Sequence, residues 1–281
     1  MRWRRWLLAA AIVGAVLGPG APAMAWGSYG HGLIAARAYD QLVPRQPWLA
    51  TQREAFMWGA LAPDVGGCAH GTMAHAAGTL ASLWREAEAT GDAGSKAFVL
   101  GWAVHLAADE VEHAGSAARV SAFREALAAI EAPPPPEAIG PLVDWALDAA
   151  LVPVGNGTLT HIFYAAASNV ASPGSAPLRE MLKRVLGVDE PAYVGYARHQ
   201  ALSSAGSIDR YFETRARSLQ IGPWEGALRA PSVRLALGDL TPLVIRAVDR
   251  GIQRAGALLE RPENAATGPR RQAPPSPAAG S

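Results

Sequence analysis

Three side chains able to bind a metal ion recur at intervals of four residues between positions 101 and 113. They are His105, Asp109 and His113, and this interval places side chains along one face of an α-helix. Trp, Leu and Ala surround them, so we predict a buried helix whose polar groups need partners. A metal ion would be such a partner. The spacing alone leaves open the alternative that a core histidine is hydrogen-bonded to a nearby acid.

Most other candidate ligands lie in the first part of the chain. They are Trp26, His31, Asp64, His70 and His75. Nitrogen and carboxylate ligands without a thiolate suit zinc in a catalytic rather than a structural site. Each residue also has a simpler interpretation, since Asp64 can cap a helix, His31 can be a surface histidine and His70 a loop histidine.

The elements that position these residues are expected to be helices. Leu33, Ala38 and Leu42 recur at helical spacing, and Pro44 ends this first helix. An apolar segment follows at about 48–61, and further helices are expected at about 76–89 (opened by His75), 96–113, 119–130, a segment carrying Asp144 and Asp148, 158–169, 176–186, 191–217 and 239–259. Strand signals are almost absent. The sequence predicts an all-α, single-domain multi-helix bundle.

Residues 1–25 have the parts of an export signal. Arginines come first, an apolar run covers 7–17, and the small-x-small cleavage sequence Ala-Met-Ala lies at 23–25. The apolar run is short for a bilayer span, which takes about 20 residues. We therefore expect cleavage before Trp26 and export to the periplasm or the exterior. The domain then covers 26–260, and the Pro-, Ala-, Gly-, Ser- and Arg-rich tail at 261–281 is expected to be disordered.

The charge of the processed chain argues against duplex nucleic acid as a partner. Cleavage removes three arginines and no acid, so the 25 basic residues fall to 22 against 24 acidic ones. This balance offers no basic surface of the kind that binds a duplex. The single cysteine, Cys68, excludes an intrachain disulfide, so stability must come from a core, to which a bound metal could add. We expect a monomer.

Four segments together resemble the zinc-dependent phospholipase C family, whose superfamily also contains the single-strand-specific zinc nucleases. They are Trp26-Gly-x-x-Gly-His31, Gly59-Ala-Leu-Ala-Pro-Asp64, the lone His75, and Gly101-x-x-x-His105-x-x-x-Asp109-x-x-x-His113. The resemblance covers residues 26–113. It implies an α-helical bundle with a trinuclear zinc site, which agrees with the all-α prediction made from periodicity.

The resemblance also implies roles for six of these residues. Trp26 would bind one zinc ion through its α-amino nitrogen and carbonyl oxygen, and His31 would complete that site. An α-amino group, with a pKa near 7.7–8.0, loses its proton readily to a metal ion, so signal cleavage would create a ligand. Asp109 would bridge to a second zinc ion, whose remaining ligands would be Asp64, His75 and His105. The alternative for Trp26 is an ordinary packed aromatic residue at a new terminus.

The third zinc site of the family is incomplete in this sequence. His113 can supply its first histidine, although many members place that residue six rather than four positions beyond the bridging aspartate. The expected His-x-x-x-Glu or His-x-x-x-Asp pair is missing: Asp144 is the best acidic candidate, but Gly140 stands four residues before it. His161 could substitute from elsewhere in the chain, and the alternative is that it is a structural or exposed histidine. We assign Asp148 to a helix contact.

The function implied is that of a secreted zinc phosphodiesterase acting on phospholipid head groups at a membrane surface. Zinc ions would neutralise the phosphodiester oxygens and activate water, and Asp64 would orient or deprotonate that water. Two alternatives stay open. One is a single-strand nuclease, and the other is a zinc-stabilised helical protein with little hydrolytic activity, which the incomplete third site favours. His199 and Cys68 are expected to be structural.

Overall fold

The computed structural model describes residues 26–64, 73–76, 78–129, 134–135, 139–155, 176–187, 212–213, 216–217, 222–228 and 230–260. All regular secondary structure in these ranges is helical, and the expected all-α fold is confirmed. Several predictions concern residues outside these ranges: the export signal, the tail, the helix at 158–169 with His161, most of the helix at 191–217, and the roles of Cys68, His70 and His199. They stay predictions.

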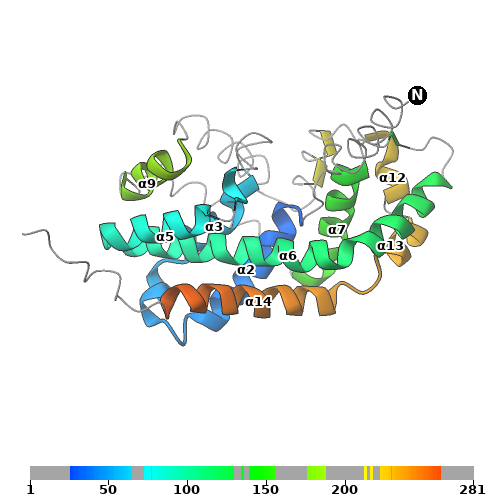
Figure 1. Cartoon of the computed structure of the whole chain (residues 1–281). Helices are drawn as coiled ribbons and strands as arrows, with labels where there is room; N and C mark the ends of the chain where they lie inside the picture. Colours follow the sequence, from blue (N-terminus) through cyan, green and yellow to red (C-terminus); the bar gives the residue numbers. More distant parts are fainter. Residues whose placement is uncertain are drawn as a thin grey trace, which may run out of the picture.

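One long helix, α6 (Ala93–Ala128), runs through the whole described part of the molecule (Figure 1). It begins at Asp92, whose carboxylate accepts a hydrogen bond from the Ser95 N–H at 2.6 Å. The sequence predicted two helices here, at 96–113 and 119–130, and that division is wrong. The linking residues include one glycine but no proline, and the roughly 1 kcal/mol that a glycine costs is small beside the packing available to a central helix.

Helices pack directly on α6 from several sides and build the core around it. They include α2 (Ser28–Leu42), α3 (Arg53–Leu61) and α14 (Thr241–Leu259). Figure 1 shows α14 lying along one side of α6, while α3 and α5 (Thr79–Thr90) lie on the other side. The expected helix at 239–259 is therefore confirmed, with α14 starting two residues later. This sandwich buries α6 deeply enough to hold polar side chains away from solvent.

The crossing of α3 and α6 is unusually close because a glycine of each helix faces the backbone of the other. A Cβ added at Gly59 would lie 2.6 Å from the carbonyl carbon of Phe98, and one at Gly101 would lie 2.9 Å from Ala60 N and closer still to the Phe56 oxygen. Real Cβ atoms do not approach other atoms so closely. The crossing therefore requires glycine at both positions, and it brings the end of α3 against the N-terminal third of α6.

The remaining elements complete the described fold. The sequence predicted α9 (Ala176–Leu186) with the same bounds, while α12 (Glu225–Leu228), α13 (Pro231–Leu237), η1 (Pro47–Thr51), η2 (Ala62–Asp64) and η5 (Gly222–Trp224) were not anticipated as separate elements. The expected helix carrying Asp144 and Asp148 is α7 (Ile139–Gly155).

The start of α5 differs from the prediction that His75 opens this helix. The helix begins only at Thr79, and His75 lies in the turn before it. Local hydrogen bonds explain the delay, since the Thr79 hydroxyl donates to Met73 O at 2.7 Å and the Thr79 N–H donates to Ala76 O at 3.0 Å. His75 therefore lies in a turn and is not part of α5.

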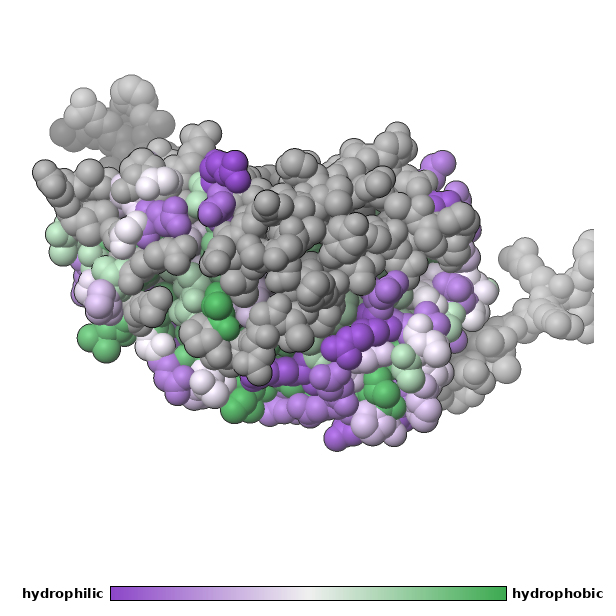
Figure 2. Space-filling model, turned by 180° about the vertical axis from the view of Figure 1, so that it is seen from behind, coloured by the Kyte–Doolittle hydropathy of each residue, from purple (hydrophilic) through white to green (hydrophobic). Residues whose placement is uncertain are grey.

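The described surface carries no large apolar region in the view of Figure 2. Hydrophobic residues (green) are scattered there among hydrophilic ones (purple). Among the described residues, the large hydrophobic side chains that are exposed are Met73, Leu235 and Ile245. Single exposed residues of this kind are usual on a protein surface. None of the described helices combines the length and apolar character needed to cross a bilayer.

Candidate metal centre

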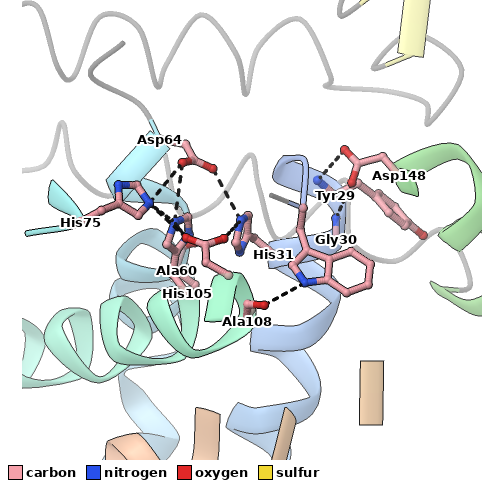
Figure 3. A network of polar contacts seen from close by, with 11 residues as sticks. Tyr29, Gly30, His31, Ala60, Asp64, His75, His105, Ala108 and Asp148 are labelled. Carbon is pink, nitrogen blue, oxygen red and sulfur yellow. Dashed lines mark hydrogen bonds and ion pairs between the residues drawn. The ribbon is translucent and has the colours of Figure 1, made fainter. Parts of the chain in front are cut away.

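Five of the residues that the sequence singled out come together in one cluster (Figure 3). His31 comes from α2, Asp64 from η2, His75 from the turn before α5, and His105 and Asp109 from neighbouring turns of α6. They form two groups of three that share His105, one with His31 and Asp109, the other with Asp64 and His75. Within each group the ligand atoms all lie within 4.8 Å of one another. The cluster could therefore bind metal at two adjacent positions.

Asp109 has the arrangement of a bridging carboxylate. Its Oδ1 lies 3.3 Å from His31 Nε2, while its Oδ2 lies 3.1 Å from His75 Nε2 and 3.2 Å from His105 Nε2. Each oxygen thus faces a different side of the cluster. Ligand atoms on a tetrahedral zinc ion, with bonds of about 2.0–2.2 Å, lie roughly 3.3 Å apart. The measured separations match the edges of such a coordination shell.

Asp64 closes the cluster from the opposite side. Its Oδ2 lies 3.6 Å from His31 Nε2, and its Oδ1 lies 3.6 Å from His105 Nε2 and 3.8 Å from His75 Nε2. These distances are too long for hydrogen bonds but suit two atoms that share a cation. The three imidazole nitrogens consequently lie between two carboxylates.

A backbone carbonyl fixes the tautomer of His105. Its Nδ1 lies 2.9 Å from Ala60 O, and a carbonyl oxygen only accepts, so Nδ1 carries the hydrogen. In the neutral ring this leaves the lone pair on Nε2, which faces His75 Nε2 at 3.1 Å and both carboxylates. Metal-binding histidines are commonly oriented by such a bond to the other ring nitrogen. The close crossing of α3 and α6 supplies this carbonyl.

The cluster is buried on one side and open on the other. The side chains of His31, His105 and Asp109 are 1%, 0% and 6% exposed, whereas those of His75 and Asp64 are 33% and 37% exposed. His31 Nε2 and both Asp109 oxygens are buried without a hydrogen-bond partner. Buried polar atoms of this kind are costly unless something satisfies them. A cation among these atoms would satisfy all three, so the donor set fits a metal ion.

The electrostatics of the cluster favour positive charge. Burial lowers the pKa of His105, but the charges of Asp109 and Asp64 outweigh burial and raise this pKa from 6.5 to about 9. Burial also acts to raise the pKa of Asp109, yet the charges of His105 and His31 hold it well below its ordinary value. Without metal, the carboxylates therefore keep a proton on His105, and the same field attracts a metal cation.

Trp26, the first residue that the structure describes, lies beside this cluster. Trp26 is 1% exposed, and its indole N–H donates to Ala108 O at 3.2 Å, next to Asp109. The His31 N–H donates to Gly27 O at 3.1 Å, which ties His31 to the residue after Trp26. The packed indole agrees with both interpretations of Trp26. Its role as an α-amino ligand stays a prediction.

The residues expected to hold a third metal ion lie outside both groups. His113 is exposed one turn beyond Asp109 on α6, and Asp144 is half-buried on α7. Within the part of the chain that the structure describes, no third group of ligand atoms assembles. Among the described residues, His113 and Asp144 therefore join no such group, and their part in a third site stays a prediction.

One buried acid near the cluster was not among the candidates. Glu112, three residues after Asp109 on α6, is 1% exposed, and burial raises its pKa from 4.5 to about 7 despite the opposing charge of Arg119, 3.8 Å away. The spacing of three from Asp109 was a signal for it, since i and i+3 share a helix face. The neighbouring His113 is the residue that the sequence predicted as a ligand instead.

The arrangement thus offers nitrogen and oxygen ligands, a bridging carboxylate and an open face, all from residues 31–109. These features can hold metal and admit a small anionic group from one side. Comparisons of the chain with protein-family models, with curated proteins and with solved structures find no match, so the site is identified from its own residues.

Proposed function

We propose that the protein is an exported, zinc-dependent phosphodiesterase of the phospholipase C type that hydrolyses phospholipid head-group phosphodiesters. The observation that carries this proposal is the pair of three-residue ligand groups that share His105, with the two Asp109 oxygens facing different histidines and one side of the cluster open to solvent. The order of the motifs in residues 26–113, behind a signal-like start, supports the family assignment. Zinc is the metal of choice because the donors are imidazoles and carboxylates without a thiolate.

In this proposal the ligands form two sets, one for each of two adjacent zinc ions. His31, Asp109 and the amino terminus at Trp26 would hold one, and Asp64, His75 and His105 would hold the other, with Asp109 shared. Zinc held by these residues would neutralise phosphodiester oxygens and lower the pKa of bound water. We propose His113 and Asp144 as ligands of a third ion.

Asp64 has a further role in this proposal. Its side chain is 37% exposed and faces the open side of the cluster, where substrate and water would enter. A carboxylate there can orient the attacking water and accept its proton. Asp109, only 6% exposed, is too enclosed for that role and serves as ligand alone.

The proposal is tested by counting metal in the purified, processed protein and by assaying phosphatidylcholine, a chromogenic phosphodiester and single-stranded DNA. We expect at least two zinc ions per chain and cleavage of the first two substrates. The matched variants are His75→Ala, which removes a ligand, and Arg85→Ala, an exposed position on α5 away from the cluster. Fewer than two ions in the wild type would refute the phosphodiesterase.

The absence of a third ligand group among the described residues favours a second candidate, a zinc-stabilised helical protein with little hydrolytic activity. Zinc in small structural sites contributes about 10–16 kcal/mol, enough to stabilise a chain with one cysteine. Two bound ions without activity on any of the three substrates would favour this candidate. Cleavage of single-stranded DNA alone would instead assign the chain to the nuclease type.

A further inference from the structure

The first turn of α2 lacks a capping side chain of its own. Gly27 stands at the N-cap, and no acidic residue lies in the first turn. The first four N–H groups of a helix have no partners within the helix and need acceptors from elsewhere. They find one on α7, far along the chain. Asp148 accepts the Gly30 N–H through Oδ1 at 2.8 Å and the Tyr29 N–H through Oδ2 at 3.2 Å (Figure 3).

The two glycines of the starting motif make room for this carboxylate. A Cβ at Gly27 would lie 2.6 Å from Asp148 Cγ and closer still to Oδ2. A Cβ at Gly30 would lie 3.2 Å from Asp148 Oδ1 and 3.0 Å from the Trp26 side chain. The motif Trp-Gly-x-x-Gly-His is thus explained by a contact with a residue more than a hundred positions later.

Asp148 is completely buried, which is rare for a carboxylate. The helix N-terminus compensates part of the burial cost, because its N–H groups and dipole favour negative charge. A hydrophobic residue would avoid that cost altogether. The carboxylate is therefore better explained by what it positions than by stability alone.

The turn that Asp148 holds is also the turn that presents His31. The His31 N–H donates to Gly27 O, so His31 follows Gly27 by one helical turn. Neither ring nitrogen of His31 makes a hydrogen bond. The ring is held instead by its backbone and by stacking on His105, with centroids 3.8 Å apart and planes inclined by 18°. A shift of the first turn would therefore move His31 Nε2 away from Asp109.

We propose that Asp148 is a positioning residue of the metal centre, which fixes the start of α2 so that His31 and Asp109 form one ion-binding position. It acts selectively, because the other position draws Asp64 and His75 from η2 and the turn before α5. This inference rests on the proposed function only in requiring that the cluster binds metal. Hydrolytic activity is not part of it.

The test is a Co²⁺ titration of the purified, processed chain, followed by absorbance and by elemental analysis. Asp148→Ala should weaken binding of one ion at least tenfold and leave the other within twofold of the wild type. Asp148→Asn, which keeps one acceptor oxygen, should show a smaller loss at the same ion. Gly27→Ala should reproduce Asp148→Ala, because its Cβ would displace the carboxylate.

The matched control is Asp92→Ala, which removes the N-cap carboxylate of α6 about three turns from His105. It should bind both ions as the wild type does. Unchanged binding by Asp148→Ala, or an equal loss at both ions, would overturn the inference. If Asp148→Ala fails to fold by circular dichroism, Asp148→Asn decides in the same way.

The outcomes separate this inference from the proposed function. A selective loss of one ion in a protein that cleaves no phosphodiester supports the positioning role and refutes the enzyme. If the wild type cleaves a phosphodiester and Asp148→Ala binds Co²⁺ as the wild type does, the enzyme is supported and the positioning role is refuted. A wild type that binds no ion refutes both.

Discussion

Gly101→Ala tests whether the close crossing of α3 and α6 builds the metal centre. The added Cβ would lie 2.9 Å from Ala60 N and 2.9 Å from the carbonyl carbon of Phe56. Non-bonded heavy atoms settle at about 3.5–4.0 Å, so the two helices must separate by roughly 1 Å or more. Both obstacles are backbone atoms, so no side-chain rotation relieves the overlap.

The expected cost follows from two opposing terms. Overpacking of a buried contact costs about 1–3 kcal/mol, and a displacement of two backbones lies at the upper end of that range. Alanine regains about 1 kcal/mol through its better helix propensity. The net loss is about 2 kcal/mol, which in a domain of this size lowers the unfolding temperature by about 4–8 °C.

The same separation would reach the ligands. His105 Nδ1 donates to Ala60 O at 2.9 Å across this crossing, and an added 1 Å would break the bond that orients the ring. Metal affinity should fall about 10-fold or more, as when other orienting partners of ligating histidines are removed. Isothermal titration with zinc measures this loss, and urea unfolding in EDTA measures the stability.

Gly256→Ala on α14 is the matched control, because a Cβ there meets nothing within 4 Å. It should stabilise the protein by about 0.5–1 kcal/mol and leave zinc binding unchanged. A Gly101→Ala protein with the stability of Gly256→Ala and native zinc affinity would show that the helices do not meet as described.

Three further predictions concern protons and metal. In EDTA, the free energy of unfolding should fall as the pH rises from about 6.5 to about 9, because protonated His105 stabilises the fold and loses its proton over this window; His105→Asn should remove the slope in urea titrations. Glu112→Gln should gain stability over the wild type as the pH rises from about 4.5 to about 7, since burial raises the pKa of the carboxyl; equal curves for the two proteins would contradict this. Zinc at 100 times its Kd should add about 2.7 kcal/mol per ion and raise the unfolding temperature accordingly, while His75→Ala should show a smaller rise in differential scanning calorimetry.

Helical periodicity was enough to predict the all-α fold, whereas the five clustered side chains were predicted from ligand spacing together with the resemblance of four segments to a known family. His105 and Asp109 share a face because they lie on one helix, which is a local property. The other three ligands, His31, Asp64 and His75, were predicted from the order of the segments that carry them. The helical spacing and the chemical type of these residues can both be read directly from the sequence.

Long-range contacts explain what the sequence did not reveal. The continuity of α6 depends on packing by α14, a helix that begins more than a hundred residues later. The delayed start of α5 depends on hydrogen bonds donated by the Thr79 hydroxyl and N–H, which compete with a helical turn. The contact of Asp148 with the first turn of α2 joins residues 118 positions apart, and no local pattern encodes such a pairing.

The uneven exposure of the cluster has a kinetic consequence. His31 and Asp109 are enclosed by α2 and α6, whereas His75 stands in a turn with a third of its side chain exposed. Exchange at a metal proceeds as an incoming ligand replaces one that can swing away, so the side held by the turn gives way first. A chelator should therefore remove the two ions in separate phases, a fast one from the outer position and a slow one from the inner position, and reloading should fill the inner position first.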